Sequence, residues 1–565
     1  MDQAFEEIRE LRAEEILAAL DEEQRQVALA TSGPVCVIAG AGTGKTRAIT
    51  HRIAYASAIG VMNPQKVLAL TFTARAAGEM RTRLRALGVP SVSARTIHSA
   101  ALRQLVFFWP SVFGGRTPDL LTSKSRFIAE AISRAGLTDS LPVTSKDFLR
   151  EVASEIEWAK VSMIHPEEYL NDTKGRPERN RVSAGQMGQV YSAYLTLMRQ
   201  EHSMDFEDVL LLTTAMIEQE REVRERVQDQ YRFFTVDEYQ DISQLQQRLI
   251  NAWLGNRREL CVVGDPAQTI YSFAGATPIF LSGFTNRFPD AQVVRLTTGY
   301  RSTPEIIFTA NSILRSGNMG QETVALNEHG ARPQAIHYKD ENAEVAGVVI
   351  EIGKLILQGV AAQNIAVLAR TNLQLSAVAR GCATAQIPFQ VRDNEKFFER
   401  PDVRDFLKGV RQASVIPTSG VTWHEELRTL AQPFITTATN DGITALLHLG
   451  RELDADPGFS PKTLRSYLRE VQDRVEQNNP PAMPVTTLST LHAAKGLEWD
   501  YVFLIGAEEG ILPANENSAE EERRLFYVGI TRAKLQVSLS YRQKPSRFLR
   551  EAGLMELGIE PASAN

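Results

Sequence analysis

The chain has 565 residues, of which 43% are hydrophobic, 23% are charged and 7% are aromatic, and its formal net charge at pH 7 is −6. This length exceeds what one hydrophobic core can organise, so we expect about three or four domains. The net charge excludes a polypeptide that is basic throughout, although a basic groove remains possible because steering depends on how charge is distributed.

The three cysteines, Cys36, Cys261 and Cys382, lie far apart, and none belongs to a C-x-x-C pair. This pattern argues against a zinc finger and against a disulfide framework, and it is typical of a reducing cytosol. The N-terminal stretch is charged and mixed in sign, unlike a signal peptide, and no apolar run is long enough to span a bilayer. We therefore expect a cytoplasmic protein that does not contact a membrane.

Short apolar runs typical of β-strands alternate with long helical patterns along the chain. The runs occupy 34–40, 66–73, 231–238 and 260–265 in the first half, and 291–296, 364–370, 501–507 and 535–541 in the second. Near-continuous apolar strands separated by helices are typical of parallel sheets that are covered on both faces. The sequence therefore predicts an α/β fold with two sheet domains.

Two long stretches without strand-like runs interrupt this alternation. The first lies between "ARTIHSA" and "MDFEDVL", spans about a hundred residues and has a helical pattern. The second runs from about 406 to 484 and ends in the proline-rich "NNPPAMP", which is typical of a connection. We expect each sheet domain to carry one helical insertion.

A glycine-rich loop, "VIAGAGTGKTR", overlaps the end of the first strand-like run and leads into a helical pattern. Gly40, Gly42 and Gly44 allow backbone N–H groups to turn toward phosphate oxygens. In such a loop Lys45 reaches the β- and γ-phosphates, and the Thr46 hydroxyl binds Mg²⁺. The strict motif begins with glycine where this chain has alanine. The alternative interpretation of the loop is a glycine-rich turn beside a surface lysine. The strand before and the helix after favour the phosphate site.

The stretch "FFTVDEYQD" delivers Asp237 and Glu238 to the carboxyl end of an apolar strand, where ligands of open α/β sheets bind. Asp237 is suited to hold Mg²⁺, directly or through water, and Glu238 to orient and deprotonate an attacking water. The alternative is a pair of solvated acids in a turn. Because a phosphate loop precedes them in the chain, the catalytic interpretation is favoured, and the lack of an N-K-x-D motif argues against a GTPase.

A third stretch, "GDPAQTIYSFAGA", places a glutamine close to two aromatic residues at the end of a strand. Tyr271 and Phe273 either turn into the core or face a ligand different from that of Gln268. The residues of this stretch alone leave both interpretations open.

With these three motifs in this order, the sequence resembles a superfamily 1A DNA helicase of the UvrD/Rep/PcrA type. The other motifs of that family are in register between Leu20 and Tyr541: "LDEEQRQVA", "TFTARAAGEM", "ARTIHSA", "GYRST", "TLHAAKGLEWD" and "EEERRLFYVGITRAK". Details such as "QTIYSF" are most similar to actinobacterial UvrD-like helicases that carry a C-terminal HRDC domain. We expect no such domain here, and therefore either a shorter relative or a truncated one.

The resemblance implies two RecA-like P-loop domains with parallel sheets. The expected division is 1–95 and 205–280 for the first motor domain, 96–204 for its helical insert, 281–405 and 485–545 for the second motor domain, 406–484 for its short helical insert, and 546–565 for a C-terminal tail.

The resemblance also implies ATP and Mg²⁺ as cofactors. Catalytic roles fall to Glu238, to Gln268 as the γ-phosphate sensor, and to Arg301 and Arg532, which stabilise charge on the transferred phosphoryl group as arginine fingers do. Metal binding falls to Thr46 and Asp237. Nucleotide binding falls to Gln24, Gly42, Thr43, Gly44, Lys45, Thr46, Arg47, Tyr300 and Glu498.

The implied partners are single-stranded DNA and 3′-tailed duplex DNA, with possible DNA-repair proteins, and the implied travel is 3′→5′. Base stacking contributes about 1–3 kcal/mol per base and tolerates any sequence, which suits a protein that moves along a strand. The implied DNA-binding residues are Phe72, Thr96, His98, Tyr271, Phe273, Arg370 and His492.

Two alternatives remain at this point. One is an ATP-dependent translocase that displaces proteins from single strands and unwinds duplex poorly. This is compatible with Phe273 and Ala274, which stand where relatives usually carry Trp-Arg, and with the short second insert. The other is a scaffold protein with a degenerate ATPase site, against which the intact motif residues argue.

Overall fold

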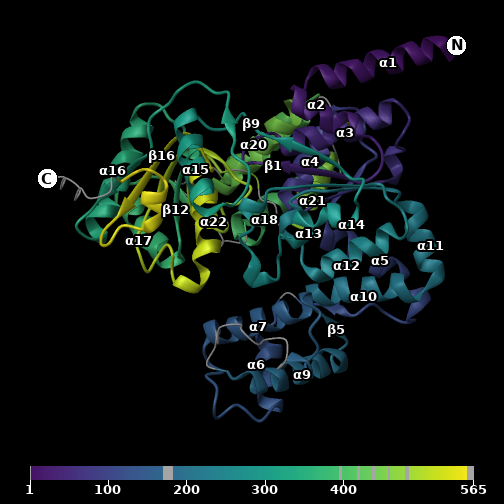
Figure 1. Cartoon of the computed structure of the whole chain (residues 1–565), viewed down its shortest axis with the longest axis horizontal. Helices are drawn as coiled ribbons and strands as arrows, with labels where there is room; N and C mark the ends of the chain where they lie inside the picture. Colours follow the sequence, from purple (N-terminus) through teal and green to yellow (C-terminus); the bar gives the residue numbers. More distant parts are fainter. Residues whose placement is uncertain are drawn as a thin grey trace.

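The computed structural model describes residues 2–121, 123–169, 182–392, 397–415, 420–434, 441–455, 459–476, 481 and 483–555. Two parallel sheets, each with six strands, form its framework, with helices on both faces (Figure 1). This confirms the predicted α/β class. None of the helices in these ranges is long and apolar enough to cross a bilayer.

The first sheet has the strand order β3-β2-β6-β7-β1-β8. Its strands are β1 (Val35–Ala39), β2 (Val67–Thr71), β3 (Ser93–Thr96), β6 (Phe233–Val236), β7 (Leu260–Gly264) and β8 (Gln292–Leu296). The central strands β2 and β7 are buried along their whole length, as their continuous apolar runs require.

The position of β8 differs from the expected domain boundary at 280/281. The expected division places this strand in the second motor domain, but it pairs in parallel with β1 from Val35 to Ala39. The pairing covers the edge of β1 and buries Val294 and Leu296 in the core of the first domain. The first sheet therefore extends to Leu296.

The second sheet has the strand order β11-β16-β15-β12-β14-β13. Its strands are β11 (Gln334–His337), β12 (Ile365–Ala369), β13 (Phe389–Val391), β14 (Thr486–Thr490), β15 (Trp499–Leu504) and β16 (Ala533–Tyr541). Two minor pairs join β4 (Asp119–Leu120) to β5 (Ser203–Met204), and β9 (Thr298–Gly299) to β10 (Val324–Ala325).

The helices fall into groups that follow the sheets and inserts. Those around the first sheet are α1 (Asp2–Ala18), α2 (Glu22–Leu29), α3 (Lys45–Ala58), α4 (Ala74–Ala86), α5 (Ile97–Val112), α10 (Phe206–Gln219), α11 (Arg221–Gln230), α12 (Gln244–Leu254), α13 (Ile279–Ser282) and α14 (Phe284–Arg287). Those around the second are α15 (Pro304–Gly317), α16 (Glu341–Leu357), α17 (Asn372–Thr384), α22 (Ala519–Ile530) and α23 (Arg547–Glu551).

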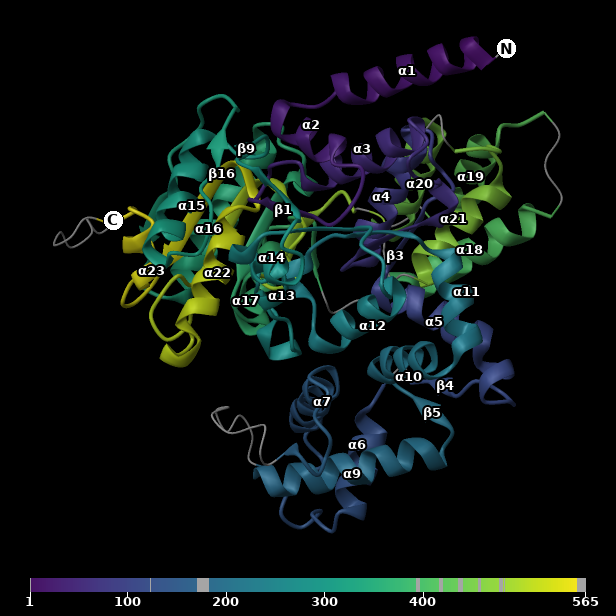
Figure 2. The same cartoon turned by 45° about the vertical axis from the view of Figure 1, so that its right-hand side comes forward.

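The first insert forms a separate lobe built on α6 (Ser125–Arg134), α7 (Lys146–Val161) and α9 (Ala184–Gln200), which both views show at the bottom of the molecule (Figures 1 and 2). Its own core includes Phe127, Ile156 and Tyr194. By contrast α5, which was expected to open the insert at 96, packs its apolar face into the core of the first domain. The lobe therefore begins after α5.

The second insert contains α18 (Pro401–Ala413), α19 (Trp423–Ala431), α20 (Asp441–Ala455) and α21 (Leu464–Glu476). It has a core of its own, centred on Phe406, Leu427, Leu446 and Tyr467. Figure 2 shows these helices in green at the right of the view.

A buried polar network joins the first insert to the first motor domain. The Lys160 ammonium of α7 lies 2.7 Å from Asp205 Oδ2 and 2.7 Å from Asp208 Oδ1, both at the start of α10, and the Tyr194 hydroxyl donates to Asp205 at 3.0 Å. The side chains of Lys160 and Asp205 are fully buried. Burial opposes ionisation of Asp205, but Lys160 and Lys124 outweigh it and lower the pKa of this carboxyl. The first insert is thus held to the first motor domain by buried charges, each of which is stable only because the opposite charge is present.

We expect Lys160→Met to destabilise the protein by about 3–5 kcal/mol, because it leaves the Asp205 carboxylate buried without its cation. The matched control is Lys146→Met, which changes an exposed lysine of the same helix and is expected to stay within about 0.5 kcal/mol. Urea denaturation followed by tryptophan fluorescence measures both. Equal midpoints for the two variants would contradict the importance of this network.

Candidate nucleotide and DNA site

The glycine-rich loop lies between β1 and α3, as its motif predicts. Gly42 and Gly44 have left-handed backbones with φ of 74° and 79°, and Gly44 caps the N-terminus of the 14-residue α3. The Thr43 hydroxyl donates to Gly40 O at 3.0 Å and holds the loop in shape. The N–H groups of the first turn of α3 therefore face outward at a helix N-terminus, which favours bound phosphate.

The two acids follow β6 and reach the same loop. Asp237 Oδ2 lies 3.4 Å from the Thr46 hydroxyl, and Glu238 Oε1 lies 3.5 Å from Lys45 Nζ. Glu238 has a left-handed φ of 54°, which is costly for a residue with a side chain and is typical of functional sites. The fold therefore brings together side chains that are about 190 residues apart in sequence.

Burial and mutual repulsion shape the ionisation of this pair. Burial, together with the neighbouring Glu238, raises the pKa of Asp237. Burial also opposes ionisation of Glu238, but Lys45 outweighs it and lowers the pKa of that carboxyl. A hydroxyl and a buried carboxylate are hard oxygen ligands of the kind Mg²⁺ prefers, so Thr46 and Asp237 fit an Mg²⁺–nucleotide complex.

Gln268 lies between the two motor domains and is 3% exposed. Its amide nitrogen donates to Asp265 Oδ2 at 2.8 Å in the first domain. Its amide oxygen accepts from Arg532 Nη2 of the second domain at 3.5 Å. One side chain therefore touches groups from both sides of the cleft.

The two arginines of the second domain lie beside the phosphate loop. Arg301 Nε is 2.6 Å from Glu498 Oε2, and a side chain at Gly42 would press against Arg301 Cβ at 2.7 Å. Arg532 is buried and donates to the backbone oxygens of Val528 and Leu497 at 3.0 Å each. Burial and the charge of Arg301 lower the pKa of Arg532 to about 9. The lowered pKa shows that the Arg532 cation is destabilised in this structure, so a nearby anionic ligand would stabilise it.

The residues expected at the adenine end also lie at this cleft. Gln24 Nε2 donates to Thr43 O at 3.1 Å, and Tyr300 N–H donates to Gly42 O at 2.9 Å. The Tyr300 hydroxyl bonds to Asp21, and Arg47 donates to the backbone oxygen of Ala19. Glu498 pairs with Lys534 as well as Arg301, and although burial opposes its ionisation these cations hold its pKa at about 2.

Sequence reasoning missed Lys495, which crosses the domain boundary. Its ammonium lies 2.5 Å from Asp241 Oδ2, 2.5 Å from Gln268 O and 5.1 Å from the centre of the Tyr271 ring. Burial raises the pKa of Asp241 to about 6, although Lys495 opposes this rise. The lysine stands inside the quoted "TLHAAKGLEWD", but its acid lies 254 residues away, so only the fold reveals the pair.

Four aromatic residues expected at the DNA form one cluster across both domains. The rings of Phe72 and Tyr271 stack with centroids 5.2 Å apart, and Phe273 meets the His492 ring edge-on at 5.6 Å. The Tyr271 hydroxyl donates to His492 O at 3.0 Å. Tyr271 also packs against the core of the second domain, whereas Phe72 and Phe273 are 38% and 40% exposed. Tyr271 thus turns partly into the core, whereas Phe72 and Phe273 stay exposed, and a role of these rings in binding DNA stays a prediction.

Arg370 and Thr96, also expected at the DNA, already have protein partners, and the two histidines expected there are uncharged. Arg370 forms a two-pronged ion pair with the buried carboxylate of Glu522 at 2.9–3.1 Å. The Thr96 hydroxyl accepts from Ser99 N at 3.1 Å and caps α5. Burial lowers the pKa of both His98 and His492 to about 4, so both rings are neutral at pH 7.

The fold and this site define a P-loop protein whose nucleotide cleft is shared by two parallel-sheet domains. A family model for the UvrD/REP helicase N-terminal domain matches residues 20–289, and one for the UvrD-like helicase C-terminal domain matches 294–414 and 424–544. The chain therefore belongs to the UvrD/REP helicase family.

Curated relatives agree with this assignment. The chain is 43% identical over 95% of its length to the "ATP-dependent DNA helicase UvrD2" of Mycobacterium tuberculosis, of which it covers 82%. It is 27% identical over 95% to PcrA of Bacillus subtilis, covering 84% of that protein, and 28% identical over 94% to Rep of Escherichia coli, covering 93%. The higher identity to the mycobacterial protein confirms the expected resemblance to actinobacterial UvrD-like helicases.

We expect Gly42→Ala to weaken nucleotide binding at least about tenfold, because the new Cβ must enter a left-handed backbone and meet Arg301 Cβ at 2.7 Å. Gly33→Ala is the matched control, since Gly33 has a similar φ of 71° but open space around it. Anisotropy of a fluorescent ATP analogue measures both. Loss of binding in both variants would show that backbone strain, and not the close approach of Arg301, causes the effect.

Proposed function

We propose that this protein is an ATP-dependent DNA helicase that uses Mg²⁺ and moves 3′→5′ on single-stranded DNA. The observation that carries the proposal is the segment from Asp265 to Phe273. Its glutamine lies at the nucleotide cleft and its aromatic residues lie in the exposed ring cluster. The names of the relatives support the same activity.

In this proposal the first domain binds the triphosphate and supplies the base. Lys45 and the loop N–H groups hold the phosphates, and Thr46 and Asp237 hold Mg²⁺, which screens the phosphate charge when bound. Glu238 accepts a proton from the water that attacks the γ-phosphorus, and the β–γ bridging oxygen leaves with ADP. Gln24, Tyr300 and Arg47 hold the adenine end.

The second domain completes the site when the cleft closes. Arg301 and Arg532 approach the γ-phosphate and stabilise the charge that develops on it. Gln268 then exchanges its contact with Arg532 for one with phosphate, and the shift reaches Tyr271 and Phe273 through the few residues between them. Hydrolysis is thereby coupled to movement along the strand.

The proposed strand path follows the aromatic cluster and its neighbours. Phe72, Tyr271, Phe273 and His492 stack on bases, with about 1–3 kcal/mol for each stacked base. His98, Thr96 and Arg370 contact the backbone nearby. Since both histidines are neutral at pH 7, stacking provides most of the grip at this point.

The proposed division keeps two motor domains, each with a helical insert, and extends the first to Leu296. We also propose a role in DNA repair, with repair proteins as partners, and a cytoplasmic location. The three cysteines are free and buried, which suits a reducing compartment.

We expect hydrolysis to be strongly stimulated by single-stranded DNA, to vanish in Lys45→Ala and to fall at least about a hundredfold in Glu238→Gln, which loses only the base. Both variants should still bind single strands, because the proposed DNA contacts lie elsewhere. Phosphate release and oligonucleotide anisotropy measure these effects. Equal turnover with and without DNA would refute a motor, and near wild-type turnover by Glu238→Gln would refute the assigned base.

A second candidate is a translocase that displaces proteins and unwinds little. Phe273 offers a smaller stacking face than tryptophan, and the second insert is small. The mean stacking cost of about 1.4 kcal/mol per base-pair step is far below what ATP hydrolysis supplies, so grip and not energy limits unwinding.

We expect unwinding to need a 3′ tail and to fall off with duplex length, while translocation on single strands stays efficient. Duplexes with 3′, 5′ or no tails, compared with displacement of a protein block from single strands, measure this. Unwinding that prefers 5′ tails would reverse the polarity. Efficient displacement without any unwinding would select the translocase.

A further inference from the structure

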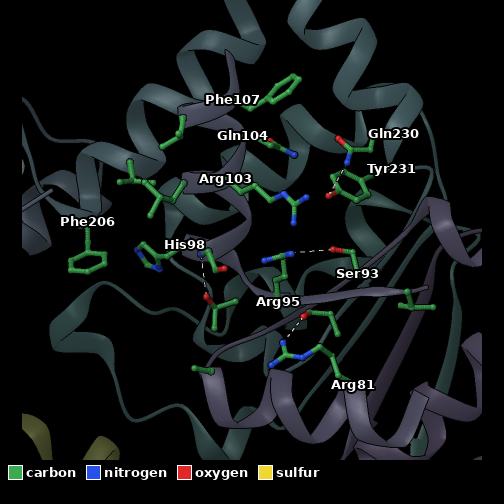
Figure 3. Close-up of a pocket in the computed structure, with 18 of the residues that line it drawn as sticks. Arg81, Ser93, Arg95, His98, Arg103, Gln104, Phe107, Phe206, Gln230 and Tyr231 are labelled. Atoms are coloured by element: carbon green, nitrogen blue, oxygen red, sulfur yellow. Dashed lines mark hydrogen bonds between the residues drawn. The ribbon is translucent and has the colours of Figure 1, made fainter. Parts of the chain in front are cut away.

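A cavity of about 1210 Å³ lies beside the proposed strand path on the first motor domain. Its walls come from α4, β3, α5 and the end of α11, with Phe206 at the start of α10 (Figure 3). The nucleotide site does not use it. Its size is sufficient for more than one nucleotide unit.

The charge of this cavity differs from that of the whole chain. Three arginines line it, Arg81, Arg95 and Arg103, and none of the acidic residues in the described ranges does. In the whole chain, by contrast, acids outnumber bases by 68 to 62. Arg81 donates to Ala94 O at 2.9 Å and Arg95 donates to Ser93 Oγ at 3.3 Å, which fixes their side chains along β3. Arg103 is exposed. The cavity therefore attracts anions.

Its wall also contains an amide group that lacks a partner. Gln104 is 5% exposed, and its amide oxygen accepts from the Trp253 indole N–H at 2.7 Å. Its amide nitrogen has no hydrogen-bond partner in the part of the chain that the structure describes. Figure 3 shows Gln104 between Phe107 and Arg103 on the cavity wall. A buried donor without a partner is costly, so it marks a place where a ligand acceptor is favourable.

An exposed aromatic ring stands on the same helix turn. Phe107 is 70% exposed and meets Phe108 edge-on at 4.8 Å. Phe108 is buried in the core, so it supports Phe107 from beneath. A phenylalanine held outward beside an arginine is suited to stack on a nucleobase whose phosphate the arginine binds.

The cavity is continuous with the proposed strand path. Phe72, Thr96 and His98 line it. Phe72 and His98 also line a smaller cavity of about 240 Å³, together with Tyr271 and Phe273. A strand lying on the aromatic cluster therefore has direct access past His98 to Arg103 and Phe107.

We propose that this cavity is a second section of the single-strand path, which holds nucleotides beyond His98. Arg95 and Arg103 bind phosphates, Phe107 stacks on a base, and the Gln104 amide donates to an acceptor on the base or sugar. The inference rests on the proposed function, since it extends the same strand. It assigns to α5 an electrostatic contact with the DNA phosphates, which the aromatic cluster does not provide.

The test measures affinity for oligothymidines of increasing length. In the wild type, affinity should keep rising as the strand grows long enough to pass His98. In Arg103→Ala and Phe107→Ala the affinity should stop rising at a shorter strand length. The affinity for long strands should then be about tenfold lower than in the wild type, and the affinity for the shortest bound strands should stay within about twofold of it. In Arg103→Ala the affinity for DNA should also depend less steeply on salt concentration, by the amount that corresponds to about one lost phosphate contact.

Matched controls remove the same groups elsewhere. Arg226→Ala deletes an exposed arginine of α11 that does not line the cavity, and Phe308→Ala deletes a phenylalanine that is 65% exposed on α15. A 2-aminopurine at either end of the strand reports stacking, and quenching at one end should disappear in Phe107→Ala alone. Since all four side chains are exposed, each variant should keep the wild-type melting temperature.

The two proposals fail in different ways. If the wild type binds DNA and its ATPase responds, but Arg103→Ala and Phe107→Ala match the controls at every strand length, the second section is refuted and the proposed function stands. If the wild-type ATPase ignores DNA and no strand binds, the proposed function is refuted, and this inference with it.

Discussion

The contact on which the rest of the structure depends is the meeting of both motor domains at Gln268. Asp265 holds its amide nitrogen, Arg532 approaches its amide oxygen, and Lys495 binds its backbone oxygen. Two of these three partners come from the second domain. Any relative movement of the domains must therefore change the surroundings of Gln268. Because Tyr271 follows only three residues later and lies under the same lysine, that change reaches the aromatic cluster directly.

The cost of buried charge explains why this contact responds to a ligand. Asp237 and Arg532 are buried and Lys45 and Glu238 are partly buried, and their pKa values shift in directions set by burial and by one another. Charged groups that are shielded from water are stable only while each has a partner of opposite charge. Adding the negative charge of a triphosphate, or removing part of it, shifts that balance most strongly at the arginines of the second domain. In the proposed mechanism, this shift in charge is the reason why the two domains would take different positions before and after hydrolysis.

Sequence reasoning predicted the class of fold and the local chemistry but not the long-range partners. The strand before Gly42 and the helix after Lys45 follow from a local pattern, so they were predictable. The position of β8 at the edge of the first sheet was not predictable, because its apolar run suits either sheet. Only the pairing with β1 shows to which sheet it belongs. The ion pairs of Lys495 and Arg370 also join segments far apart in the chain, and no local spacing indicates them.

The same reasoning separates two kinds of grip on a strand. The aromatic cluster has little net charge, because burial keeps His492 neutral and Asp241 pairs with the Lys495 ammonium beside Tyr271. Nearby, burial keeps His98 neutral and Glu522 pairs with Arg370. Stacking of this kind tolerates any base, which suits movement along a strand. Arginine contacts to phosphate are salt-sensitive, and in the proposed path they lie at β3 and α5 of the first domain. In the proposed path, a strand that spans both regions is held by arginine contacts at one section and by stacking at the other, which would let the domains release one section while the other still holds.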